Sequence, residues 1–234
     1  MYDPIETDAS YDYLLKLSQR VSGLRYAIMG GWGVYFQVGK EYRKAFGREY
    51  LKSRDIDVFV EASDELAFLA IIKELGFVES AYNFRYELVY DREEKKIISS
   101  KSAKSKPIYD LVYIFLDVFS NRKTSKLGSW VLPDLKEAKI VEIEKIPILD
   151  INLLLRLKAV SFFEREKLDK ELKDACDIYA LLLYSNTKVL PNVLLKKTIE
   201  KILNRPDLQE YIAEQVLGDV FKASLVVNNL KILS

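Results

Sequence analysis

The hydrophobic periodicity of this chain changes once, near residue 148, and this change constrains the fold more than any other feature. Before it, short apolar or alternating runs are interleaved with segments whose apolar residues recur every three or four positions. These patterns are typical of strands and helices. After it, only the helical pattern remains. We therefore predict an α/β (α+β) fold in which a domain over residues 1–147 combines strands and helices and an all-helical lobe covers residues 148–234.

The expected elements follow from the same patterns. We predict strands over residues 24–29, 55–60, 84–90 and 108–119, with an edge strand over 140–146. Helices are expected to begin near residues 10, 32 and 65 in the first domain, and near 150, 169, 190, 206 and 218 in the lobe. The basic segment 39–54 is expected to leave a helix end and form an exposed loop, and the charged segment 91–106 to connect two strands.

Missing residue types limit the chemistry. The 234 residues include no histidine and one cysteine, Cys176, which excludes imidazole-dependent catalysis and His- or Cys-rich metal sites. Carboxylates, lysines, arginines and backbone amides remain, and these favour magnesium and phosphate chemistry. The net charge of +1 gives no global sign of nucleic-acid binding. The lone cysteine, with no signal-like start and no apolar run of membrane-spanning length, predicts a cytoplasmic protein without membrane association.

Two aspartates stand two residues apart on the strand predicted over 55–60. Side chains at positions i and i+2 of a strand point to the same face, so Asp55 and Asp57 project together. Adjacent carboxylates repel each other unless a cation joins them, and hard oxygen ligands suit Mg²⁺ or Mn²⁺ together with substrate phosphates. The alternative interpretation is a strand that ends in two solvated acids.

A glycine pair, Gly30-Gly31, separates the strand predicted over 24–29 from the helix that follows. Small residues let a phosphate approach the backbone closely, and the free N–H groups at a helix start attract anions. We therefore expect a triphosphate cradle beside the acids. A tight turn without a ligand is the alternative.

A third carboxylate would complete a site for two metal ions. Asp110 interrupts the apolar run over 108–119, where an unpaired charge would be costly to bury. We predict that Asp110 joins Asp55 and Asp57 as a metal ligand and accepts a proton from the incoming hydroxyl. Asp117 is the alternative third acid, and a solvated strand end is the competing interpretation of Asp110.

Together these residues resemble the pattern of the DNA polymerase β-type nucleotidyltransferase superfamily, with a glycine pair after a strand, the acidic strand Asp55-Ile56-Asp57 and a later strand acid. The C-terminal part is similar to motifs of AbiEii-type nucleotidyltransferase toxins. Those motifs are represented here by Leu157-Lys158-Ala159, Arg165, Lys173-Asp174 and Asp177-Ile178.

The resemblance implies a mixed, nucleotidyltransferase-type sheet flanked by helices, with a helical C-terminal lobe. It also implies dependence on Mg²⁺ or Mn²⁺, and transfer of NMP from an NTP to an acceptor, often RNA such as a tRNA end. The likeness to AbiEii-type proteins also implies a toxin with an antitoxin partner. The catalytic and metal-binding residues implied are Asp55, Asp57 and Asp110. The nucleotide-binding residues implied are Gly30, Gly31, Ser53, Arg54 and Lys158.

Departures from the family pattern leave other functions open. Leu51 stands where relatives carry an arginine, with Lys52 or Arg54 as its substitute, and residues 40–52 form an insertion. A catalytically weak, nucleotide-binding regulatory module is therefore the second hypothesis. A metal-dependent nuclease, which would combine the two strand acids with Glu94-Lys95-Lys96, is the third.

Two cations of the lobe also have an alternative role. Lys158 and Arg165 are about two helical turns apart and share one helix face. They could clamp phosphates, or they could form interhelical ion pairs with Asp174 or Asp177.

Overall fold

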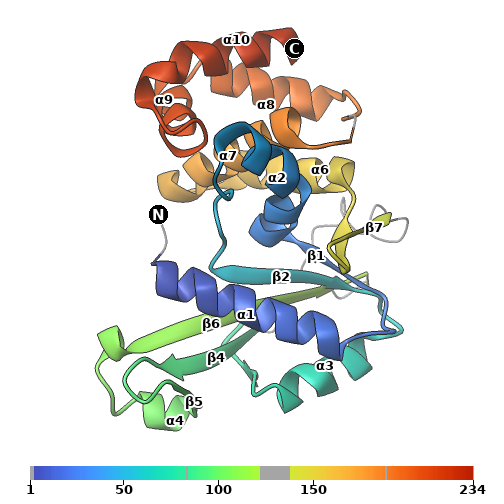
Figure 1. Cartoon of the computed structure of the whole chain (residues 1–234). Coiled ribbons are helices and arrows are strands. Elements are labelled where there is room, and N and C mark those ends of the chain that lie inside the picture. The colour runs from blue at the N-terminus through green and yellow to red at the C-terminus, as the bar shows by residue number, and fades with distance from the viewer. Residues whose placement is uncertain (1–2, 83, 122–137, 188, 234) are drawn as a thin grey trace. The chain divides into compact units, whose positions relative to one another are not determined.

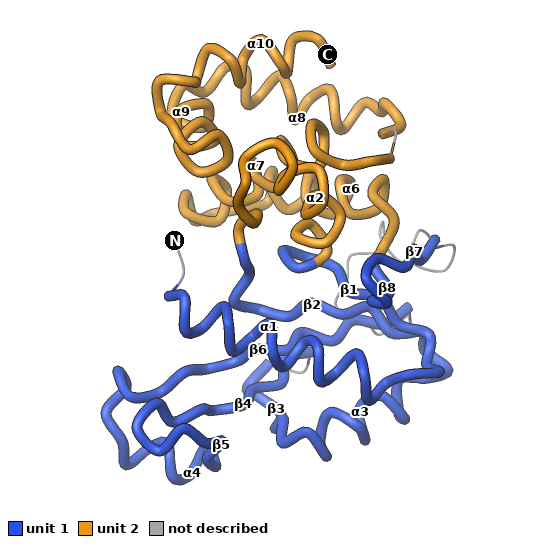
Figure 2. Tube along the Cα trace, in the orientation of Figure 1, with its two compact units in different colours: residues 1–32, 52–148 blue, residues 33–51, 149–234 orange. Residues whose placement is uncertain are grey.

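The structure is a computed structural model in which residues 3–82, 84–121, 138–187 and 189–233 are described. The chain divides into two compact units (Figure 2), a sheet unit of residues 1–32 and 52–148 and a helical unit of residues 33–51 and 149–234. The predicted domains and these units share the division near residue 148. They differ over residues 33–51, which cluster with the C-terminal helices instead of the sheet.

A mixed eight-stranded sheet organises the described part of the sheet unit (Figure 1), as the family resemblance implied. The strand order is β3-β4-β6-β2-β1-β8-β7, and β5 pairs with β4. Strands β2 and β6 are parallel, as are β1 and β8, whereas β1 with β2 and β4 with β6 are antiparallel. The strands are β1 (Tyr26–Met29), β2 (Asp55–Val60), β3 (Val78–Glu79), β4 (Arg85–Asp91), β5 (Lys96–Ile98), β6 (Leu111–Ser120), β7 (Ile140–Ile143) and β8 (Ile146–Leu149).

The two faces of the central strands differ in burial. Even-numbered side chains such as Ile56, Val58 and Leu116 are completely buried. Helices α1 (Pro4–Arg20) and α3 (Glu65–Glu74) are joined by an ion pair between Arg20 and Glu74 at 2.6 Å, and α1 lies along the sheet in Figure 1. Several odd-numbered side chains of β2, β4 and β6 remain half-buried. Polar groups on this second face are therefore accessible to a ligand.

The remaining helices belong mainly to the helical unit. Helix α4 (Ser100–Ala103) and the 3₁₀ turn η1 (Ile108–Asp110) lie in the sheet unit, while α2 (Gly30–Phe46) begins there and continues into the helical unit. The other elements of the helical unit are α6 (Ile151–Glu164), α7 (Leu168–Tyr184), α8 (Val193–Leu203), α9 (Pro206–Gln215), η2 (Val220–Lys222) and α10 (Ala223–Leu233). No described helix combines the length and apolar character needed to cross a membrane.

The prediction that residues 39–54 leave a helix end and form an exposed loop holds for the backbone of residues 47–54, but the segment is not exposed throughout. Helix α2 continues to Phe46, and Tyr42 and Tyr50 are buried within the helical unit. The Tyr42 hydroxyl donates a hydrogen bond to the backbone carbonyl of Val216 at 2.6 Å. Although the segment is rich in charged residues, it contains two tyrosines, and their burial holds the segment against the C-terminal helices.

Candidate functional site

The two predicted acids lie together on the half-buried face of the sheet. Strand β2 begins at Asp55, and Asp55 and Asp57 occupy alternate positions on it. The parallel pairing with β6 places Asp57 in register with Asp117 and Asp55 in register with Phe115. Residues in register on neighbouring strands share a face and lie about 5 Å apart. The structure therefore brings three aspartates, Asp55, Asp57 and Asp117, to one part of the sheet.

The third acid is not the one that we preferred from the sequence. Asp110 ends the 3₁₀ turn η1, and β6 begins only at Leu111. At about 3.3 Å per residue, Asp110 lies about 23 Å along the strand from Asp117. The prediction that Asp110 sits beside Asp55 and Asp57 is wrong. The apolar run begins with a 3₁₀ turn that contains Asp110, and the residue of β6 in register with Asp57 is Asp117.

Arg85, which the sequence analysis missed, completes this cluster. It lies on β4 in register with Asp117. Its Nε and Nη2 atoms donate hydrogen bonds to Asp117 Oδ1 and Oδ2, both at 2.7 Å, and its Nη2 is 3.7 Å from Asp55 Oδ2. The hydrogen bonds with Asp117 raise the pKa of Arg85 further. Its guanidinium also stacks 4.8 Å from the centre of the Phe115 ring.

The two residues before β2 organise its first acid. Arg54 Nε is 3.0 Å from Asp55 Oδ1, and its guanidinium lies 5.5 Å from the Phe115 ring centre. Ser53 is buried, and its hydroxyl donates a hydrogen bond to the backbone carbonyl of Asp55 at 3.1 Å. Arg54 is thus available at the site, whereas Ser53 shapes the start of the strand.

Position 30 has no room for a side chain, because the Asp57 carboxylate lies against the backbone of Gly30. Helix α2 begins at Gly30, whose φ is +60°. A Cβ at this position would lie 1.9 Å from Asp57 Oδ2. Met29, the residue before it, is in register with Asp57. The backbone therefore passes directly against the Asp57 carboxylate, at a helix N-terminus whose dipole favours negative charge. Gly31 is helical and buried in the same first turn.

The acids of this cluster provide some, but not all, of the ligands that a divalent ion needs. Among the residues that the structure describes, no group of three acidic or cysteine side chains is arranged to hold a metal ion. The predicted cage of Asp55, Asp57 and Asp110 is therefore not formed, and Asp117 is bound to Arg85. Asp55 and Asp57 remain, and Mg²⁺ is commonly held by one or two carboxylates together with substrate phosphates.

Lys158 belongs to a buried ion cluster within the helical unit. Its Nζ lies 2.9 Å from Asp174 Oδ1 and 2.6 Å from Asp177 Oδ2, while Arg165 Nε lies 2.8 Å from Asp174 Oδ2. Burial acts to lower the pKa of Lys158, but the charges of the two aspartates outweigh it and raise the pKa. The buried Tyr50 hydroxyl donates a hydrogen bond to Asp177 at 3.0 Å. The expectation that Lys158 contacts phosphates is corrected in favour of interhelical pairing.

The nuclease-like triplet lies at the other end of the strands. Glu94 follows β4, whose last residue Asp91 is in register with Leu111 at the start of β6. Its carboxylate is paired with Lys106 at 2.6 Å and Lys96 at 2.5 Å, and these hydrogen bonds lower the pKa of Glu94. The triplet therefore does not join the acids of β2.

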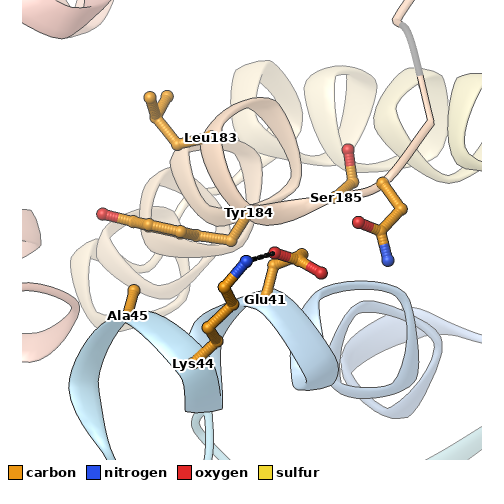
Figure 3. A pocket seen from close by; sticks show the side chains of 7 residues that line it. Glu41, Lys44, Ala45, Leu183, Tyr184 and Ser185 are labelled. Atoms are coloured by element: carbon orange, nitrogen blue, oxygen red, sulfur yellow. Dashed lines mark ion pairs between the residues drawn. The ribbon is translucent and has the colours of Figure 1, made fainter.

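A pocket of about 400 Å³ lies in the helical unit (Figure 3), but it contains none of the predicted site residues. Lys44 and Glu41, one helical turn apart on α2, face each other with Nζ and Oε2 3.9 Å apart. The lining residues are Glu41, Lys44, Ala45, Leu183, Tyr184, Ser185 and Asn186.

Comparisons with known proteins give similarities of structure alone. No family model and no curated protein matches the sequence. An antigenic nucleotidyltransferase-like protein from Paracoccidioides brasiliensis is 18% identical, with 90% of this chain and 93% of that chain covered and a TM-score of 0.48. The lincomycin-bound lincosamide antibiotic adenylyltransferase LnuA is 14% identical (76% and 98% covered, TM-score 0.40). The antibiotic-resistance factor ANT(2'')-Ia is 11% identical (99% and 94% covered, TM-score 0.38).

Proposed function

We propose that this chain is a metal-dependent nucleotidyltransferase that moves NMP from an NTP to an acceptor hydroxyl. The main support is the register of β2 and β6, which sets Asp57 beside Asp117 on the face that also carries Asp55. The close approach of Gly30 to Asp57 adds a helix N-terminus at the same place. Acids on one face and an anion-attracting helix start are the two halves of a site for a nucleoside triphosphate with its cation.

The residues take separate roles in this reaction. Asp55 and Asp57 would hold Mg²⁺ or Mn²⁺, which, when bound, neutralises charge on the triphosphate. The first turn of α2, from Gly30, and the Arg54 guanidinium would orient the phosphates. The acceptor oxygen forms a bond to the α-phosphorus, the bond from that phosphorus to pyrophosphate breaks, and the hydroxyl proton passes to a carboxylate oxygen of Asp117.

RNA, such as a tRNA end, is the acceptor class that the AbiEii-like motifs favour. A role as a toxin with an antitoxin partner follows from the same motifs. In the structure Lys158, Arg165, Asp174 and Asp177 of these motifs form the ion cluster of the helical unit.

A nucleotide-binding regulatory module is the second candidate, favoured by one observation. Asp117 is held by Arg85, and no three acids among the described residues form a metal site. Such a site could bind an NTP with one cation and not turn it over. Tight NTP binding without pyrophosphate release would distinguish this function from transfer.

The test is transfer of label from each α-³²P-labelled NTP to total RNA in the presence of Mg²⁺. The wild type is expected to label RNA, with chelation of the metal abolishing the signal. The Asp55→Ala/Asp57→Ala and Asp117→Asn variants are expected to lose it. Asp110→Asn is the matched control, because it removes an acid outside the cluster, and it should retain activity. Equal labelling by wild type and the Asp55→Ala/Asp57→Ala variant would refute the proposed function.

A further inference from the structure

Arg85 occupies the position between two of the three acids. Its guanidinium makes a two-point contact with Asp117 and approaches Asp55. The Asp117 side chain is 7% exposed and the Arg85 side chain 24%. Charge-assisted two-point contacts of this kind are strong and directional. A cation that is to be ligated by Asp117 must therefore compete with a guanidinium that is already in place.

The local charges also limit what this site can hold at rest. Two guanidiniums, Arg54 and Arg85, face the three carboxylates Asp55, Asp57 and Asp117. Three negative and two positive charges leave a net charge of −1, so one divalent ion already brings this group to +1. A second would place excess positive charge next to Arg85 unless an anionic ligand entered with it.

Phe115 allows Arg85 to change partners without losing its support. The ring is in register with Asp55, next to Asp117 on the same face of β6, and the guanidinium stacks over it. Stacking leaves the N–H groups at the edge of the guanidinium free to point elsewhere. Phosphate oxygens offer the same two-point geometry as a carboxylate.

We propose that Arg85 is a positioning residue that withholds Asp117 from the metal, so that the site takes one divalent ion at rest and a second only when an NTP draws Arg85 to its phosphates. This inference rests on the proposed function, because it assumes that Asp55 and Asp57 hold a divalent ion. It predicts that nucleotide binding and the binding of the second ion are coupled.

The experiment counts bound Mn²⁺ by electron paramagnetic resonance of the free ion during titration of the full chain. The wild type is expected to bind one Mn²⁺ alone and a second with a non-hydrolysable NTP analogue. Arg85→Gln should bind the second ion without nucleotide. Arg54→Gln is the matched control, since it also removes a guanidinium from Asp55 but leaves Arg85 on Asp117. Without the analogue, this control should bind a single ion.

A double variant guards against loss of folding. Arg85→Gln/Asp117→Asn removes both partners and leaves no uncompensated charge, and it should bind one ion with or without the analogue. A second ion in this double variant, a second ion in Arg54→Gln without the analogue, or an Arg85→Gln protein that binds Mn²⁺ as the wild type does, would overturn the role of Arg85. Undiminished binding in Asp55→Asn/Asp57→Asn would instead overturn the proposed metal site. No binding to any variant would overturn both.

Discussion

Replacement of Gly30 by alanine tests the link between backbone geometry and the acid cluster. The new Cβ would lie 1.9 Å from Asp57 Oδ2, whereas real Cβ contacts are essentially never shorter than 3.0 Å. The carboxylate must therefore retreat by about 1 Å, a displacement that can cost about 100-fold in rate when it affects a reacting geometry. The residue also has a φ of +60°, which costs a non-glycine residue about 1–2 kcal/mol.

The assay separates these two effects. Urea denaturation of Gly30→Ala should show a loss of at least about 1 kcal/mol in the free energy of unfolding. Transfer of labelled NMP should fall by about 100-fold under conditions in which the variant is folded. Mn²⁺ affinity should fall as well, because Asp57 is a proposed ligand and its carboxylate has moved.

Gly23→Ala is the matched control. Gly23 has a φ of +91°, and a Cβ there would meet nothing within 4 Å. This variant carries the backbone strain without the collision, so it should lose about 1–2 kcal/mol of stability and keep wild-type transfer and Mn²⁺ binding. If Gly30→Ala were as active as Gly23→Ala at equal folded fraction, the proposed dependence of the site on Gly30 would be refuted.

Two further predictions concern the ion cluster of the helical unit. Lys158→Met leaves two buried aspartates without their shared cation and should lower the free energy of unfolding, measured by urea denaturation, by about 3–5 kcal/mol. Lys197 is exposed, so the control Lys197→Met should change this free energy by less than about 0.5 kcal/mol. Equal effects of the two substitutions would contradict the assigned role of Lys158. Burial acts to raise the pKa of Asp174, but Lys158 and Arg165 outweigh it and hold the pKa below 3.8. The resulting stability is present above pH 3.8 and is lost as the pH falls through the lower folded value. Asp174→Asn should reduce this acid dependence of unfolding, and an unchanged slope would contradict it.

The local parts of the candidate site could be predicted from the amino-acid sequence. Strand β2 has the predicted bounds, Asp55–Val60. Placement of Asp55 and Asp57 on one face follows from the period of a strand, which is a property of neighbouring residues alone. The break after β1 at Gly30 was likewise readable, since glycine favours such a backbone conformation. The alternation of strands and helices, and the helical C-terminal elements after it, followed from the change in hydrophobic period, whereas the mixed sheet was implied by the family resemblance.

Contacts between residues that are distant in the sequence depend on how the strands and helices pair and pack. Asp117 instead of Asp110 stands beside Asp57 because the register of β2 on β6 is set by backbone pairing between segments far apart in the chain. No sequence motif indicated Arg85 as a site residue. Its contact with Asp117 depends on the register between β4 and β6. Helical spacing predicted which face of its helix Lys158 occupies. The anion that pairs with a buried lysine depends on the packing of the helices, and in this structure Asp174 and Asp177 pair with Lys158. Pairing and packing are non-local, and a one-dimensional pattern does not contain them.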